Sequence, residues 1–190
     1  MSWTALIPLK AAGDRKSRLA DRLSAEARER LSRQLFDHVA GVLSAHPAIA
    51  SVLPLSTRRP EGWTRDWLAD EDRGLNPALM TARASLGLGP LLVIHADLPL
   101  LSADGIDRLL EGGDREGLAI APDRHLSGTN ALAIADGRPF DFRFGPDSFA
   151  IHRRQAGERC AVIEHPGLGL DLDTGEDLDA AIAAGFLFDA

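Results

Sequence analysis

The only two lysines of the chain, Lys10 and Lys16, lie in the segment PLKAAGDRKSRLADRL, which starts at residue 8. All the other residues among its 21 lysines and arginines are arginines. Lysine carries a compact point charge that can follow a phosphate group, whereas arginine prefers fixed bidentate partners. The same segment contains Gly13 and Arg18. These residue types predict a cationic loop that binds the phosphates of a ligand.

Three aspartates in two distant segments have the chemistry of a divalent-cation site. Asp97 ends the apolar segment PLLVIHAD, and Asp171 and Asp173 alternate with leucines in LDLD. In an extended segment this spacing places both carboxylates on one face, with Leu170 and Leu172 on the other. Like charges side by side repel unless a cation lies between them, so the pattern predicts a Mg²⁺ site for a polyphosphate substrate. The polar residues that follow are interpreted as a helix cap: Thr174, Glu176 and Asp177.

Two further segments are typical of ligand-binding loops. HLSGTNAL combines small hydrogen-bonding residues with Gly128, which permits close backbone approach. FGPDSFAIH places Gly145 and Ser148 at a helix N-terminus, where free N–H groups favour anions. His152 follows Ser148 by four residues, so both are expected on the same side of that helix. The remaining histidines are interpreted as surface or packing residues: His38, His46, His95, His125 and His165.

Missing motifs and bulk composition exclude several classes. The sequence has no P-loop pattern, no GxGxxG, no zinc-ligand spacing and no arrangement for covalent catalysis by serine or cysteine. A net charge of −7 argues against a duplex nucleic-acid partner. No apolar stretch approaches the roughly 18 residues of a membrane span, and the N-terminus does not resemble a signal peptide. With Cys160 as the single cysteine, we expect a cytoplasmic protein.

The elements that must position these residues alternate between strand and helix. Apolar runs predict strands at 4–9, 49–56, 90–97, 117–123 and 130–136, with further strand character in CAVIEH and GLGLDLD. Helices are predicted at 24–45, 76–87, 102–113, 146–157 and 175–185, with Ser24 and Asn76 as N-caps of the first two. The order predicts one α/β domain over 1–190, with a mostly parallel sheet flanked by helices. Ligands bind beyond the carboxyl ends of such strands, where the cationic loop and Asp97 fall.

Taken together, the motifs resemble the CofC/FbiD family, the guanylyltransferases of deazaflavin-coenzyme (F-420) biosynthesis. Six segments occur in the family's order between residues 7 and 178: PLKAAGDRKSRLA, GLNPAL, HADLPLL, APDRHLSGTNAL, FRFGPDSFAIH and LDLDTGEDL. The resemblance implies a Rossmann-like sheet of the GT-A type. It also implies that a phosphorylated acid attacks the α-phosphorus of GTP and releases pyrophosphate. The favoured acids are 3-phospho-D-glycerate and phosphoenolpyruvate, with 2-phospho-L-lactate as a further candidate.

The resemblance also implies roles for individual residues. The Mg²⁺ ligands would be Asp97, Asp171 and Asp173. The triphosphate loop would supply Lys10, Lys16 and Arg18. The phospho-acid would contact Thr129, Gly145 and Ser148, and His152 is grouped with them because it is expected on the same side of the helix as Ser148. The nucleotide would contact Gly13, Asn76 and Asn130.

Other functions remain compatible with the sequence. One is a non-catalytic module that binds a nucleotide or phospho-acid without releasing pyrophosphate. Another is a nucleotidyltransferase of molybdenum-cofactor biosynthesis, although the usual glycine-rich loop of that group is altered here. A nicotinamide-dependent oxidoreductase is disfavoured by the missing GxGxxG. The sequence identifies no guanine-reading residue and leaves the oligomeric state open, so a homo-oligomer is compatible with it.

Overall fold

The structure, a computed structural model, describes residues 2–9 and 16–188. Two residues of the predicted cationic loop, Lys10 and Gly13, lie outside these ranges. The strands are β1 (Trp3–Pro8), β2 (Ile49–Ser56), β3 (Leu68–Ala69), β4 (Leu91–Ile94), β5 (Leu118–Pro122), β6 (Thr129–Ile134) and β7 (Ala161–Val162). The helices are η1 (Ser17–Leu19, a 3-10 turn), α1 (Ala25–Ala45), α2 (Leu75–Leu86), α3 (Ala103–Glu116), α4 (Ser148–Ala156), α5 (Pro166–Gly169) and α6 (Gly175–Ala183).

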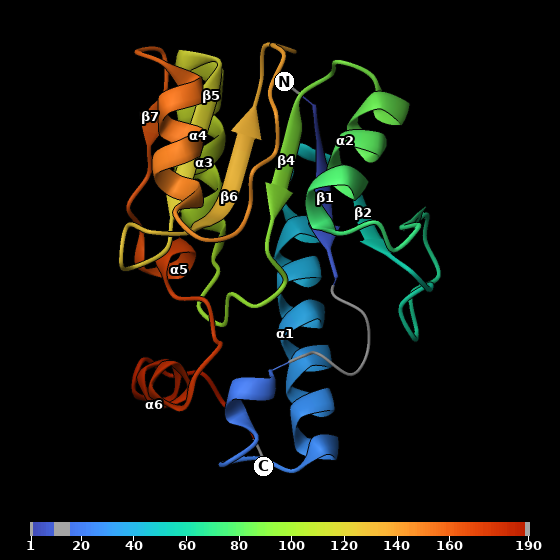
Figure 1. Cartoon of the computed structure of the whole chain (residues 1–190), viewed down its shortest axis with the longest axis vertical. Helices are drawn as coiled ribbons and strands as arrows, with labels where there is room; N and C mark the ends of the chain where they lie inside the picture. The colour runs from blue at the N-terminus through green and yellow to red at the C-terminus, as the bar shows by residue number, and fades with distance from the viewer. Residues whose placement is uncertain (1, 10–15, 189–190) are drawn as a thin grey trace.

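The strands form one sheet in the order β3-β2-β1-β4-β6-β5-β7 (Figure 1). All paired neighbours run parallel except β6, which is antiparallel to both β4 and β5. The predicted mostly parallel α/β sheet is therefore confirmed. The exception arises because residues 123–128, which join β5 to β6, form a turn far too short for a parallel crossover. As a result, the first residues of β6 lie at the same edge as the carboxyl ends of the other strands.

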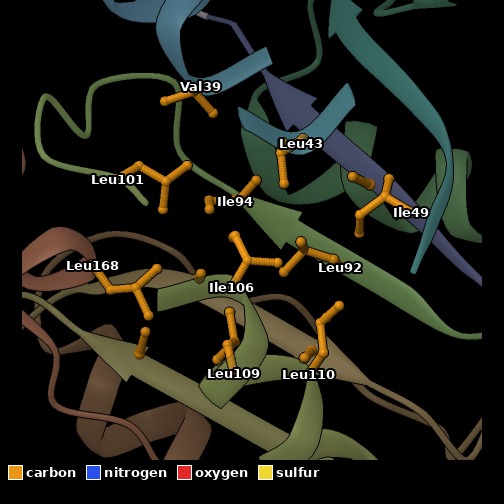
Figure 2. Packing of buried hydrophobic residues seen from close by; sticks show 14 of the residues in the cluster. Val39, Leu43, Ile49, Leu92, Ile94, Leu101, Ile106, Leu109, Leu110 and Leu168 are labelled. Carbon is orange, nitrogen blue, oxygen red and sulfur yellow. The ribbon is translucent and has the colours of Figure 1, made fainter. Parts of the chain in front are cut away.

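Two apolar clusters cover the two faces of the sheet. On one face α1 and α3 pack against β1 and β4, and on the other α2, α4 and the phenylalanines of residues 140–144 pack against the same strands and β6. Figure 2 shows the side chains through which α1, α3 and β4 meet in the first cluster: Val39, Leu43, Leu92, Ile94, Ile106 and Leu109. Burial on both faces explains why the central strands read as continuous apolar runs in the sequence.

A third apolar cluster lies beyond the sheet, where η1, the first half of α1 and α6 meet (Figure 1). It contains Leu19 of η1 together with Leu170 and Leu172, which precede α6. The 21-residue α1 helix, about 31 Å long, reaches from the sheet to this cluster. The cluster therefore fixes the segment after the cationic loop against the segment that carries the paired aspartates.

Two local predictions are wrong, and one is confirmed. The segment GLGLDLD is not a strand, because Pro166 and the side chain of His165, which accepts from Gly167 N, start the short helix α5 there. The burial alternation nevertheless holds, since Leu170 and Leu172 are buried while Asp171 and Asp173 are partly exposed. The N-cap of α2 is a glycine, Gly74, rather than Asn76, which lies inside the first turn.

The predicted caps of the other two helices are confirmed. The Ser24 hydroxyl accepts a hydrogen bond from Ala27 N at the start of α1. At the start of α6, Thr174 and Asp177 form a reciprocal capping box. In the part of the chain that the structure describes, no helix is both long and apolar enough to cross a bilayer.

Candidate active site

A cleft of about 360 Å³ opens at the carboxyl edge of the sheet. At one end it contains the chemistry-bearing side chains predicted from sequence, namely Lys16, Asp97, Asp171 and Asp173. At the other end it is lined by residues that follow β2 and β3, among them Thr57, Asp70, Asp72 and Gly74. The cleft spans the sheet from the end of β4 to the end of β3, with polar side chains at both ends and apolar ones between them, and suits an elongated ligand with an anionic end.

Lys16 joins the two aspartate segments directly. Its Nζ donates to Asp97 Oδ2 at 2.8 Å and to Asp173 Oδ1 at 3.0 Å. The lysine side chain is 7% exposed, whereas the two carboxylates are 24% and 35% exposed. Burial alone would lower the pKa of Lys16, but the carboxylates of Asp97 and Asp173 outweigh it, so the pKa is raised and the ammonium stays charged.

Packing and backbone bonds hold this ion-pair triad in place. Lys16 adopts a left-handed conformation with φ 57° immediately before η1, and Leu19 anchors η1 in the third apolar cluster. Leu172, in the same cluster, donates its backbone N–H to Asp97 O at 2.9 Å. Apolar contacts and backbone hydrogen bonds thus bring together segments about 80 residues apart in the chain. As a result, the charged side chains of Lys16 and Asp97 lie in contact.

Asp171 lies beside this triad and completes the predicted trio of aspartates. Its Oδ1 accepts from Asn130 Nδ2 at 3.4 Å, and that amide also donates to Leu168 O at 2.9 Å. Burial raises the pKa of Asp171, and the charges of Asp97 and Asp173 raise it further. The negative charges of these carboxylates repel one another, and a cation bound among them would reduce that repulsion.

The donor set fits Mg²⁺ brought in with a nucleotide. Within residues 2–9 and 16–188, no group of three or more His, Cys, Asp or Glu side chains is arranged to hold a metal by itself. Mg²⁺ is usually bound through one or two carboxylates together with waters and substrate phosphates rather than in an all-protein cage. Asp97, Asp171 and Asp173 supply such hard oxygen ligands at the cleft wall.

The predicted phospho-acid residues gather around a buried histidine. Thr129, Ser148 and His152 are 2%, 1% and 0% exposed. Thr129 Oγ1 lies 2.9 Å from His152 Nδ1, and Arg143 N donates to His152 Nε2 at 2.9 Å. Both ring nitrogens therefore have partners inside the protein, and the predicted contact of His152 with the acid stays a prediction. Ser148 and His152 share one side of α4, as the spacing predicted.

Burial also controls the charge of His152. Burial lowers the pKa of His152 from 6.5 to about 4, and the charge of His95 contributes in the same direction. Because the unfolded chain binds this proton at higher pH than the folded one, the histidine costs stability as the pH falls from 6.5 to about 4. We expect a loss of about 3 kcal/mol over this range. Urea unfolding at several pH values should show a steeper acid loss for the wild type than for His152→Asn, and equal slopes would contradict the assignment.

Asn76 holds the loop that carries the predicted acid-binding glycine. Its Nδ2 donates to Phe144 O at 3.0 Å, and its Oδ1 accepts from Phe144 N at 2.8 Å. Both ends of the amide thus bond to Phe144, and the expected contact of Asn76 with the nucleoside stays a prediction. The next residue, Gly145, adopts φ 131°. Any other residue would be strained in this backbone conformation, even though there is open space where its Cβ would lie.

Replacing Asn76 by alanine is expected to destabilise the fold by about 1–3 kcal/mol, because Phe144 N–H and C=O lose their partners. Thermal unfolding and the KM for the acid substrate measure the two consequences. Asn76→Asp is the matched variant, since it keeps the acceptor for Phe144 N and loses the donor. The Tm and the KM of Asn76→Asp should therefore lie between those of Asn76→Ala and the wild type. An unchanged Tm for Asn76→Ala would contradict the role of Asn76 in holding this loop.

Gly128 and Asn130 both have structural roles. Gly128 is required because the Asp123 carboxylate lies 2.7 Å from where its Cβ would be, and Asp123 accepts from three backbone N–H groups of the β5–β6 turn. Asn130 is 2% exposed and bonds to the segment of Asp171, so it supports a predicted metal ligand, and its predicted contact with a nucleotide stays a prediction. Arg18 is exposed in η1, outside the cleft lining formed by the described residues. Its predicted role stays a prediction.

Sequence reasoning missed part of the cleft. His95, interpreted as a packing residue, lines the cleft next to Asp97, and its ring lies 5.2 Å from that of Phe144. Asp70 and Asp72 line the opposite end. The signal available was their position directly after a short strand, but that strand, β3, has only two residues and was not predicted.

Known proteins similar to this chain are guanylyltransferases by name. A family model described as "Guanylyl transferase CofC like" matches residues 3–186. A protein of Sphaerobacter thermophilus named phosphoenolpyruvate guanylyltransferase is 35% identical over 193 residues, covering 94% of this chain and 92% of its own. One of the same name from Nocardia farcinica is 36% identical over 197 residues, covering 95% and 85%.

A solved structure supports the fold assignment independently. The 4-diphosphocytidyl-2C-methyl-D-erythritol synthase of Anaerococcus prevotii superposes with a TM-score of 0.64, covering 96% of this chain and 95% of its own. At 11% identity this likeness concerns the fold alone.

Proposed function

Since this chain belongs to the family of CofC-like guanylyl transferases, we propose that it transfers GMP from GTP to phosphoenolpyruvate. The chain is a guanylyltransferase by family, and the choice of phosphoenolpyruvate over 3-phospho-D-glycerate and 2-phospho-L-lactate follows the names of its relatives. The observation that carries the proposal is the position of Lys16 between Asp97 and Asp173, next to Asp171, at the carboxyl edge of the sheet.

The reaction requires mainly electrostatic stabilisation of the reacting phosphates. A phosphate oxygen of the acid forms a bond to the α-phosphorus of GTP, and the bond from that phosphorus to the bridging oxygen of pyrophosphate breaks. The phosphate is already ionised at neutral pH, because its second pKa is about 6, so no strong base is needed. Lys16 supplies a buried positive charge where negative charge develops. Mg²⁺ held by Asp97, Asp171 and Asp173 would neutralise the phosphates further.

The shape of the cleft supports one orientation of GTP. With the triphosphate at Lys16 and Asp97, the base extends over β1 and β2 toward Asp70 and Asp72. The ends of β4 and β3 are three strand spacings apart, about 14 Å, which suits the reach from phosphates to base. Guanine presents N1–H and N2–H₂ donors that a carboxylate accepts together, whereas adenine presents an acceptor at N1 that a carboxylate repels.

Asp72→Asn tests this orientation. We expect kcat/KM for GTP to fall about 10- to 100-fold, because a charged hydrogen-bond acceptor is lost. Activity with xanthosine triphosphate should rise relative to GTP, since an amide N–H can donate to the xanthine O2. Asp70, which accepts from Asp72 N at 2.9 Å, gives the companion variant Asp70→Asn. An unchanged preference for GTP over the xanthine nucleotide in both variants would contradict the placement.

The proposed activity itself is tested by pyrophosphate release from GTP and Mg²⁺ with each phospho-acid in turn, using ATP and CTP as base controls. Release with GTP and phosphoenolpyruvate is the expected result. Release with 3-phospho-D-glycerate or 2-phospho-L-lactate instead would move the acceptor assignment to that acid. GTP binding without release in any combination would favour a non-catalytic module.

A further inference from the structure

We propose that His152 is a positioning residue that keeps the Thr129 hydroxyl as a hydrogen-bond donor to the acid substrate. The inference rests on the proposed function for the identity of the acceptor, but the proton arrangement that it requires can be measured without substrate. It concerns a histidine inside the protein, one layer behind the predicted acid-binding residues.

The hydrogen bonds of His152 determine which nitrogen carries the proton. A backbone N–H can only donate, so the bond from Arg143 N at 2.9 Å requires His152 Nε2 to accept. A neutral imidazole that accepts at Nε2 carries its single proton on Nδ1. His152 Nδ1–H therefore donates to Thr129 Oγ1 at 2.9 Å, and the hydroxyl oxygen is the acceptor in that bond.

The surroundings of the ring keep this arrangement fixed. His152 is 0% exposed, and the centroid of its ring lies 5.4 Å from that of Phe140 and 5.0 Å from that of Phe144. A charged imidazolium would have to donate at Nε2 toward the Arg143 N–H, which is itself a donor. The low pKa of His152 agrees with a neutral ring across the physiological range.

The consequence concerns Thr129. A threonine hydroxyl has one proton, and with His152 occupying an acceptor position of the oxygen, that proton is free to point elsewhere. The bond to His152 is the only side-chain hydrogen bond of Thr129 among residues 2–9 and 16–188. Thr129 is the first residue of β6, at the carboxyl edge of the sheet, where it is 2% exposed and lies outside the described lining of the cleft. We expect its hydroxyl to donate to an anionic oxygen of an acid that binds at this edge.

Nitrogen-15 NMR of the histidine side chains tests the proton arrangement directly in the unliganded protein. We expect His152 to be neutral with the proton on Nδ1 at pH 7, which is the minor form of free histidine. The His152 signals are assigned by their loss in His152→Asn. A proton on Nε2, or on both nitrogens, would overturn the inference whatever the enzyme's activity.

Two substitutions separate the two bonds of the ring. His152→Asn places an amide N–H near the position of Nδ1 and keeps the donor to Thr129, but it loses the acceptor for Arg143 N. His152→Gln places an amide oxygen near Nε2 and keeps that acceptor, but it loses the donor. We expect His152→Gln to raise KM for phosphoenolpyruvate about 10- to 100-fold with KM for GTP unchanged, and His152→Asn to raise KM for phosphoenolpyruvate by a clearly smaller factor, because it keeps the donor to Thr129.

Thr129 provides the matched controls. Thr129→Val should raise KM for phosphoenolpyruvate as much as His152→Gln, and the double variant should show no further increase, because both changes remove the same donated bond. Additive effects, or equal losses for the Asn and Gln variants with unchanged Tm, would overturn the positioning role. If the wild type releases no pyrophosphate with any acid, the proposed function fails, while the NMR result still stands or falls by itself.

Discussion

Replacing Lys16 by alanine is expected to lower kcat/KM for GTP at least about 100-fold while the protein still folds. Lys16 is buried between Asp97 and Asp173, so its removal leaves two carboxylates that repel the triphosphate and one fewer positive charge at the reacting phosphates. The fold survives because Leu19 anchors η1 through apolar contacts and both carboxylates can rehydrate. Steady-state pyrophosphate release measures the effect, and thermal unfolding confirms folding.

Lys16→Arg distinguishes a placed point charge from positive charge in general. A guanidinium is larger and planar, and a side chain that is 7% exposed leaves little room for it. We expect arginine to restore less than about a tenth of the wild-type activity. Arg115→Ala, at an exposed pair with the adjacent Glu116, is the surface control and should change nothing. Activity of Lys16→Ala within about 3-fold of wild type would remove Lys16 from the mechanism.

Asp171→Asn is expected to reduce kcat at least about 100-fold, because it removes one charge from the carboxylate trio without changing its size. Asn130 can still donate to the new amide oxygen, so the local backbone should keep its place. Raising the Mg²⁺ concentration should recover part of the activity, which a change in folding would not do. Kinetics as a function of Mg²⁺ therefore give the decisive measurement.

Asp179→Asn is the matched control for the loss of a carboxylate. Asp179 lies on α6 only a few residues from Asp173, is largely exposed and pairs with Arg22. Exposed pairs contribute little, so this variant should stay within about 2-fold of wild type at every Mg²⁺ concentration. If Asp171→Asn showed the same small effect, with no change in Mg²⁺ dependence, the trio would lose its proposed role.

The fold and one end of the site could be predicted because their signals are local. Continuous apolar runs marked β1, β2 and β4 through burial on both faces, and Ser24 and Thr174 marked helix starts. The placement of Asp97 needed only the rule that ligands bind beyond carboxyl strand ends. The alternation of Asp171 and Asp173 with leucines survived even where the predicted strand did not.

The remaining site depends on contacts between distant segments. Nothing near Asn76 in the sequence indicates that its amide clamps Phe144, 68 residues away. A helical spacing placed Ser148 and His152 together, but it could not tell that this side of α4 is buried. Likewise, Thr129 lies at the carboxyl edge of the sheet only because β6 runs antiparallel to its neighbours. That direction follows from the short β5–β6 turn, which Asp123 stabilises.

The bridge from Lys16 to Asp97 and Asp173 gives the ligand-free enzyme an internal counter-ion. A divalent ion that approaches these carboxylates must exchange with an ammonium already in contact with them, so we expect the ion alone to bind weakly. A triphosphate would offer the ammonium a new partner and release the carboxylates, so we expect nucleotide and ion to bind with positive cooperativity. Calorimetric titration should show tighter Mg²⁺ binding to Lys16→Ala than to wild type without GTP, the reverse of their order in activity.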